Sequence, residues 1–241
     1  MTEVDFQNTI NNSGLTWWLD SGSLLGLVRD NRFLKQDHDI DIGILYENNT
    51  DIIEGFLKNF YNDFNIVRFE FNNTLYKCKC IPKNPSVFNY IFDFQFYILD
   101  KDKMICPQMV FKRNLTLFSR IRRNIIQMRK SNPDDFSSKS IKSLIKKIGT
   151  LALSKKYQII KYGESSESLF DFYYWSIPFA YLKEQVEVKG YKAFSDYESY
   201  LAMRYGNWRI PVTHWAFTRD DKGLKKTNYK DLSCLYVLDG E

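Results

Sequence analysis

Residues 1–110 alternate between two hydrophobic patterns, one typical of helices and one typical of strands. Apolar residues spaced three and four positions apart predict amphipathic helices, while alternating or continuous apolar runs bounded by turn residues predict strands. The predicted helices are residues 3–13, 22–30 and 51–62, and the predicted strands are residues 15–20, 37–46, 65–71, 75–81 and 90–99. Interleaved helices and strands of this kind predict an α+β fold, in which flanking helices pack on a mixed sheet.

The pattern changes in residues 111–165, where apolar positions at helical spacing are combined with many lysines and arginines. Residues 111–130 and 140–161 are predicted to be helical, so the whole stretch is expected to form a basic helical segment. From Lys101 to Lys161, Lys and Arg outnumber Asp and Glu by 16 to 3, although the net charge of the chain is only +5. Such a block is expected to face an anionic membrane surface or a polyanionic acceptor, or to be the solvated face of a packed helical pair.

Composition narrows the class of protein. Hydrophobic residues make up 44% of the chain and aromatic residues 17%, which is enough for a packed core and excludes a wholly disordered chain. The acidic first ten residues contain no apolar run, and no stretch approaches the roughly 20 apolar residues of a membrane span. We therefore expect a cytoplasmic protein, with the inner face of the membrane as a second place where it would work peripherally.

The stretch DHDIDIG at residues 37–43 carries the first chemical signal. Asp37, Asp39 and Asp41 alternate with other residues, so a strand would project all three from one face. Carboxylates this close repel each other unless a cation offsets their charge. Oxygen-rich sites of this kind suit Mg²⁺ or Mn²⁺, which assist phosphoryl and nucleotidyl transfer.

Three further residues fit a site for phosphate chemistry. Gly22 and Ser23 open a predicted helix, where backbone N–H groups favour a phosphate, and Arg29 follows in the same helix. A third metal ligand is expected from Asp93, a lone charge between two phenylalanines of a later strand. The predicted catalytic carboxylates are thus Asp37, Asp39, Asp41 and Asp93, with Asp37 and Asp93 both eligible as the general base.

Two stretches resemble one known family. The order of Gly-Ser, Asp-x-Asp and a later lone Asp resembles the nucleotidyltransferase fold. LDSGSLLGLVRDNRFLKQDHDIDIGI, from Leu19 to Ile44, resembles the signature of the LicD/fukutin family, and YLAMRYGNWRIP, from Tyr200 to Pro211, resembles that family's C-terminal segment. The resemblance is carried by residues 18–45, 90–97 and 200–215.

This resemblance implies a nucleotidyltransferase-like mixed sheet and a metal-dependent transferase. Members of the family move a phosphate-linked group, of the ribitol phosphate, glycerol phosphate or phosphocholine type, from a CDP-activated donor to a glycan hydroxyl and release CMP. Residues 1–110 would then be the catalytic core, 111–165 the basic helical segment, and 166–241 a C-terminal segment that completes the active site. The expected partners are a CDP-linked donor and a surface or capsular glycan, either lipid-linked or polyanionic.

The resemblance also assigns roles residue by residue. Asp39 and Asp41 would hold the metal, with Asp93 as the third ligand expected above, and Asp37 would be a supporting carboxylate or base. The residues expected to bind the donor or to shape its pocket are Gly22, Ser23, Arg29, Tyr205, Gly206, Trp208 and Arg209.

Two other readings stay open. The protein could place a nucleotide on a small molecule, a protein or RNA, with the same metal site. Alternatively, it could be a non-catalytic nucleic-acid-binding module that uses its basic block and aromatic residues. Because the last reading gives no reason for the aspartates, nucleic acid is not expected as a partner.

Overall fold

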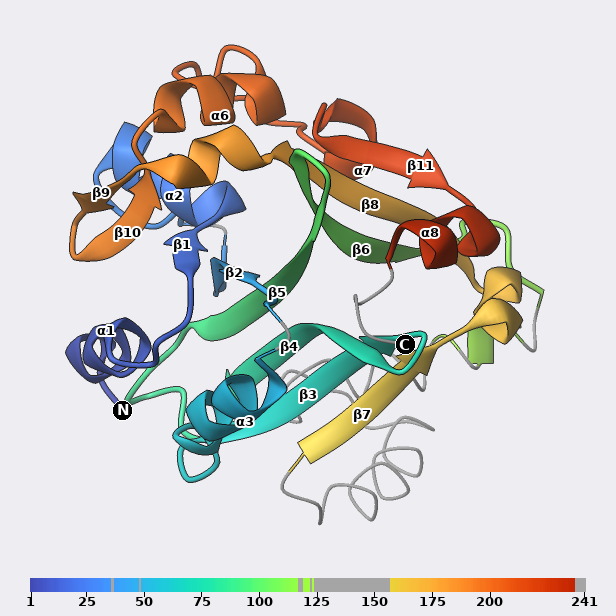
Figure 1. Cartoon of the computed structure of the whole chain (residues 1–241), viewed down its shortest axis with the longest axis horizontal. Coiled ribbons are helices and arrows are strands. Elements are labelled where there is room, and N and C mark those ends of the chain that lie inside the picture. The colour runs from blue at the N-terminus through green and yellow to red at the C-terminus, as the bar shows by residue number, and fades with distance from the viewer. Residues whose placement is uncertain (36, 48, 117–118, 122, 124–156, 237–241) are drawn as a thin grey trace.

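The fold is described by a computed structural model covering residues 1–35, 37–47, 49–116, 119–121, 123 and 157–236 (Figure 1). Its helices are α1 (Glu3–Asn11), α2 (Ser21–Asp30), α3 (Thr50–Lys58), α6 (Tyr197–Tyr205), α7 (Phe217–Asp220) and α8 (Tyr229–Leu235), with 3-10 helices η2 (Glu164–Ser168) and η3 (Phe179–Lys183). Its strands are β1 (Trp17–Leu19), β2 (Asp39–Leu45), β3 (Phe64–Phe71), β4 (Thr74–Pro82), β5 (Ile91–Asp100), β6 (Lys103–Phe111), β7 (Tyr157–Tyr162), β8 (Phe170–Pro178), β9 (Gln185–Val188), β10 (Tyr191–Phe194) and β11 (Leu224–Thr227).

The described strands form a curled mixed sheet that branches at β5. Its main path runs β11-β8-β6-β5-β4-β3-β7, and β2 adds to β5 in parallel while also carrying β1. The first part of β5 pairs with β2 and β4, whereas its last residues, Ile98 to Asp100, pair with β6. Figure 1 shows β5 between the two arms, with β4, β3 and β7 on one side and β6, β8 and β11 on the other. Strands β9 and β10 form a separate hairpin.

Aromatic packing holds helices α1 and α3 on one face of this sheet. Phe6 of α1 stacks on Phe92 of β5 with ring centroids 3.9 Å apart, and Phe56 of α3 meets Phe94 edge-on at 5.2 Å. Side chains alternate along a strand, so burying Phe92 and Phe94 on this face turns Asp93 to the opposite face. The hydrophobic pattern of β5 thus decides where its charge lies.

The expected α+β fold, with a nucleotidyltransferase-like mixed sheet and flanking helices, is confirmed. Each helix and strand predicted within residues 1–110 has a counterpart at nearly the same position. The predicted end of a helix at Gly206 is also correct, since this residue caps α6 with a φ of 68°. Within the described residues, no helix is long and apolar enough to cross a membrane.

The two predicted basic helices are wrong at their described ends. Phe111 is the last residue of β6, and residues 112–116 are not helical. Residues 157–161 were expected to continue a basic helix, but Tyr157–Tyr162 form strand β7, which pairs in parallel with β3. The edge of β3 offers unpaired backbone groups, and pairing buries Ile160 and Tyr162. Helical spacing upstream could not reveal this distant partner. Most of the predicted basic helical segment, residues 124–156, lies outside the described residues.

We expect Gly43→Ala to lower the free energy of unfolding by about 1–3 kcal/mol through overpacking. A Cβ atom at Gly43 would lie 2.2 Å from Cε2 of Trp18, a fully buried ring that packs against Tyr97 and Phe194. Urea denaturation of the variant and the wild type measures the change. The matched control is Gly55→Ala in α3, where a Cβ meets nothing within 4 Å. Because Ala favours helix over Gly, the control should be neutral or stabilising. Equal destabilisation of both variants would contradict the packing argument.

Candidate active site

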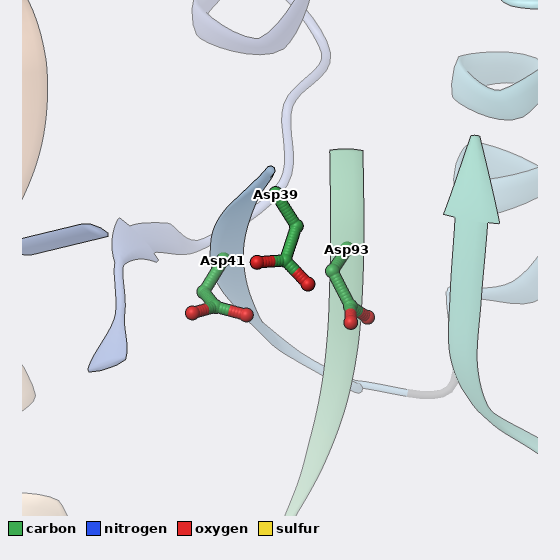
Figure 2. A group of neighbouring side chains, drawn as sticks. All are labelled: Asp39, Asp41 and Asp93. Carbon is green, nitrogen blue, oxygen red and sulfur yellow. The ribbon is translucent and has the colours of Figure 1, made fainter. Parts of the chain in front are cut away.

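Three carboxylates gather over two neighbouring strands, as Figure 2 shows. Asp39 and Asp41 lie on β2 and Asp93 lies on β5, with Asp41 directly opposite Asp93 in the parallel register. One oxygen from each carboxylate lies within 4.8 Å of the other two. The cluster therefore has the size at which one cation can contact all three side chains.

Alternation along β2 explains why its carboxylates share a face. Ile40 and Ile42 are fully buried in the core, so Asp39 and Asp41 project to the opposite side of the strand. Strand β5 follows the same rule, and its parallel register with β2 brings the two polar faces together. Hydrophobic packing on the other face of the two strands therefore holds three negatively charged side chains close together.

Two lysines of β4 contact this cluster. The Nζ atom of Lys77 lies 2.8 Å from Oδ2 of Asp93, and the Nζ atom of Lys79 lies 3.0 Å from the same oxygen. Lys79 is also 3.4 Å from Oδ2 of Asp39. Neither lysine was singled out from the sequence. The available signal was their alternation with Cys78 and Cys80, which are fully buried and leave the lysines on the opposite face.

The charges within the cluster shift its pKa values in opposite directions. Burial raises the pKa of Asp41 well above its ordinary value, and the carboxylates of Asp39 and Asp93 add to this shift. Burial also acts to raise the pKa of Asp93, but Lys77 and Lys79 outweigh it, so that pKa lies below the ordinary value. The two lysines thus favour the ionised form of Asp93, whereas burial and the neighbouring carboxylates disfavour the ionised form of Asp41.

A hard divalent cation fits the donor set. Oδ1 of Asp93 is buried and has no hydrogen-bond partner among the described residues, although both lysines contact the other oxygen of the same carboxylate. A buried carboxylate oxygen without a partner is costly, and a metal ion would satisfy it. Carboxylate oxygens from Asp39, Asp41 and Asp93 are the ligands that Mg²⁺ and Mn²⁺ prefer.

The start of α2 lies beside the carboxylates. Gly22 lines one cavity together with Asp39, Asp41 and Asp93, and a Cβ atom there would approach Oδ2 of Asp37 to 2.8 Å. Ser23 does not line the cavity; its hydroxyl oxygen accepts a hydrogen bond from the backbone N–H of Asp41 at 2.8 Å. The Ser23 side chain therefore fastens α2 to β2. Arg29 lines the cavity while its guanidinium pairs with Asp30.

Asp37 precedes β2 and lines the cavity with the other three predicted carboxylates. Burial raises its pKa, and the nearby charge of Asp39 raises it further, against a smaller opposite effect of His38. The neighbouring His38 is exposed.

The C-terminal part of the chain supplies a second part of the wall of this cavity, whose volume is about 520 Å³. Tyr205 and Trp208 line it, and Trp215 packs against Tyr205 with ring centroids 5.0 Å apart. Gly206 and Arg209 are not among its lining residues. Gly206 caps α6, as described above, and the guanidinium of Arg209 lies 4.4 Å from the ring centroid of Trp208. The two sequence signatures thus meet around one cavity.

A buried arginine connects these two parts of the wall. Arg204 of α6 is 1% exposed and donates from Nη2 and Nε to Oδ2 of Asp221, at 2.6 and 2.8 Å. Its Nη1 lies 3.3 Å from Oδ1 of Asp20, the residue that caps α2. The backbone N–H of Asp20 in turn donates to the carbonyl of Asp41 at 2.9 Å. These buried charges were missed from the sequence because their partners lie far apart along the chain.

The comparisons agree with this geometry. A family model described as LicD/FKTN/FKRP, nucleotidyltransferase domain, matches residues 14–131. No curated protein matches the chain. The matched range contains the carboxylate cluster, the start of α2 and both β4 lysines. The aromatic residues that line the cavity, Tyr205, Trp208 and Trp215 (the aromatic wall), lie beyond this range. Residues 14–131 are therefore a nucleotidyltransferase domain of the LicD/FKTN/FKRP family.

Proposed function

We propose that the protein is a metal-dependent transferase that moves a phosphate-linked group from a CDP-activated donor to a hydroxyl of a surface or capsular glycan and releases CMP. The LicD-family domain supports a transferase of phosphate-linked groups in general. The finer proposal is carried by one observation: the carboxylates of Asp39, Asp41 and Asp93 gather in one cavity, and Oδ1 of Asp93 is buried with no hydrogen-bond partner among the described residues. Ribitol phosphate, glycerol phosphate and phosphocholine are the groups proposed for transfer.

The residues proposed to hold Mg²⁺ or Mn²⁺ are Asp39, Asp41 and Asp93. When bound, such an ion would neutralise negative charge on the donor's phosphates. Gly22 lets those phosphates approach the N-terminus of α2, where backbone N–H groups favour an anion. Lys77, Lys79 and Arg29 add positive charge around the same cavity. Tyr205 and Trp208 offer ring faces to the base of the donor or to the acceptor.

Asp37 is the better of the two eligible general bases. Its pKa is raised by burial and by Asp39, whereas the pKa of Asp93 is lowered by two lysines. A carboxylate with a raised pKa accepts a proton more readily. In the proposed step, the acceptor hydroxyl gives its proton to Asp37 while the hydroxyl oxygen bonds to the phosphorus of the transferred group. The bond from that phosphorus to the departing CMP breaks.

We expect Asp37→Asn to lower kcat by about 10²- to 10⁴-fold, because the amide cannot accept the proton. Binding of Mn²⁺ should stay close to that of the wild type, since Asp37 is outside the proposed ligand set. Steady-state kinetics and a Mn²⁺ titration of the same preparation check both expectations. Loss of Mn²⁺ binding in Asp37→Asn would instead place Asp37 among the ligands.

A panel of donors tests the proposed function. The purified protein is incubated with CDP-ribitol, CDP-glycerol, CDP-choline, CTP or ATP, each with Mg²⁺ or Mn²⁺, and mass spectrometry follows CMP and pyrophosphate. CMP released from one CDP-linked donor, and lost with EDTA, would support the proposal and name the donor. Pyrophosphate from CTP or ATP would favour nucleotidyl transfer. No release from any donor, together with no metal-dependent thermal shift, would contradict both activities.

A further inference from the structure

Lys79 occupies a particular place in the carboxylate cluster. Its single ammonium group lies 3.0 Å from Asp93 and 3.4 Å from Asp39, so it bridges carboxylates of two different strands. Lys77, by comparison, makes its ion pair with Asp93. The register of the sheet fixes this difference, because Lys79 is directly opposite Asp93 whereas Lys77 is opposite Gln95. Lys79 therefore contacts two of the three groups that would hold a divalent cation.

The two lysines also change the net charge that a divalent cation meets at the carboxylates. Two ammonium groups offset much of the charge of the three carboxylates, so a free divalent cation meets a cluster that is already partly neutralised. Mg²⁺ is also slow to give up its water and is usually held by a few carboxylates together with substrate phosphates. A diphosphate that enters the cavity brings negatively charged oxygens, which can accept hydrogen bonds from the ammonium group of Lys79.

We propose that Lys79 is a resident counter-cation, which competes with a free divalent cation for Asp39 and Asp93 and turns to a phosphate of the donor when cation and donor bind together. This inference rests on the proposed metal-dependent function, and it adds that binding of the donor strengthens binding of the cation. The free protein binds the cation weakly, and the donor strengthens that binding by drawing Lys79 away from the carboxylates. Lys79 is thus a positioning residue for the metal site and a contact residue for the donor.

The test measures Mn²⁺ binding by the electron paramagnetic resonance signal of the free ion, with and without saturating CDP. In the wild type, CDP is expected to tighten Mn²⁺ binding. In Lys79→Met, we expect the Kd for Mn²⁺ without CDP to fall by about five- to tenfold, because one nearby positive charge is gone. The tightening by CDP should shrink in the same variant. Lys79→Arg keeps the charge and should bind Mn²⁺ alone as weakly as the wild type.

Lys161→Met is the matched control. Lys161 lies on β7, and its Nζ atom is 3.3 Å from Glu70, so this variant also removes one ammonium group and one ion pair. It should leave the Kd for Mn²⁺ unchanged. Where Lys79→Met does not fold, Lys79→Gln serves in its place, because the amide still donates to the carboxylates without a charge. Circular dichroism melts of each variant establish folding.

The outcomes separate this inference from the proposed function. Mn²⁺ binding by the wild type that is lost in Asp39→Asn supports the metal site itself. If the Kd of the folded Lys79 variant is then unchanged or higher, Lys79 only holds the carboxylates in place, and the counter-cation proposal is overturned. If the wild type binds no Mn²⁺ even with CDP, the proposed metal-dependent function fails and this inference fails with it.

Discussion

Asp39→Asn is expected to remove metal binding and to lower the rate of transfer by at least about 10²- to 10³-fold, since a metal ion contributes several kcal/mol to the stabilisation of transition-state charge. Asp39 is half-exposed at the start of β2, and its carboxylate lies within 4.8 Å of both other members of the cluster. An amide of the same shape keeps the contact distance but loses the negative charge. Asp39 is also more exposed than Asp93, with side-chain exposures of 34% and 3%.

The same substitution should not unfold the protein. Asp39 repels Asp41 and contributes to the raised pKa of that residue, so its neutralisation relieves the cluster when no metal is present. We therefore expect a melting temperature without metal that equals or exceeds that of the wild type, and no further rise on adding Mn²⁺. Differential scanning fluorimetry with and without Mn²⁺ measures both.

Asp171→Asn is a suitable control for this prediction. Asp171 lies on β8 and pairs only loosely with Lys226, at 3.7 Å. This variant should keep the metal-dependent thermal shift and the transfer activity. Full activity in Asp39→Asn would show that the carboxylate cluster does not do the chemistry, and the proposed function would have to be abandoned.

Local periodicity was enough to find the carboxylates but not the groups that neutralise them. Asp39 and Asp41 follow from alternation in one strand, and Asp93 follows from a charge between two buried phenylalanines. Lys79 acquires its role only when β4 pairs with β5 and sets it opposite Asp93. That register depends on the packing of the whole sheet. No pattern within β4 alone distinguishes Lys79 from a solvated lysine.

The same limit applies to the C-terminal part of the chain. The end of α6 at Gly206 is a local signal, because glycine readily adopts a positive φ. Strand β8 pairs with β6 at one side and β11 at the other, and its alternating aromatic residues were not recognised as a strand. Without that strand, the sequence cannot place Tyr205 and Trp208 in the same cavity as the aspartates. The resemblance to a family linked the two regions, and the fold supplies the geometry.

Arg204→Met is expected to lower the free energy of unfolding by about 3–5 kcal/mol, which is a large part of a typical protein's total stability. The substitution removes the guanidinium that lies between Asp20 and Asp221, which are 0% and 5% exposed. Two buried carboxylates would then keep their other hydrogen bonds but lack their cation, and a buried charge without an opposite charge is costly. Asp20 also caps α2 and bonds to the backbone of Asp41, so the damage should reach the metal site.

Urea denaturation measures this loss, and Arg209→Met is its matched control. Arg209 follows α6 and pairs with Glu198 at 2.7 Å, but its side chain is 58% exposed. A surface ion pair of this kind contributes at most about 1 kcal/mol, so the control should unfold almost as the wild type does. Arg204→Lys should fall between them, because a lysine keeps the charge but cannot reproduce the fork of donors that reaches Asp221 and Asp20. If Arg204→Met and Arg209→Met lower the free energy of unfolding equally, the buried ion pairs contribute no more to stability than a surface ion pair does. The connection between the aromatic wall and the aspartates would then have to rest on packing alone.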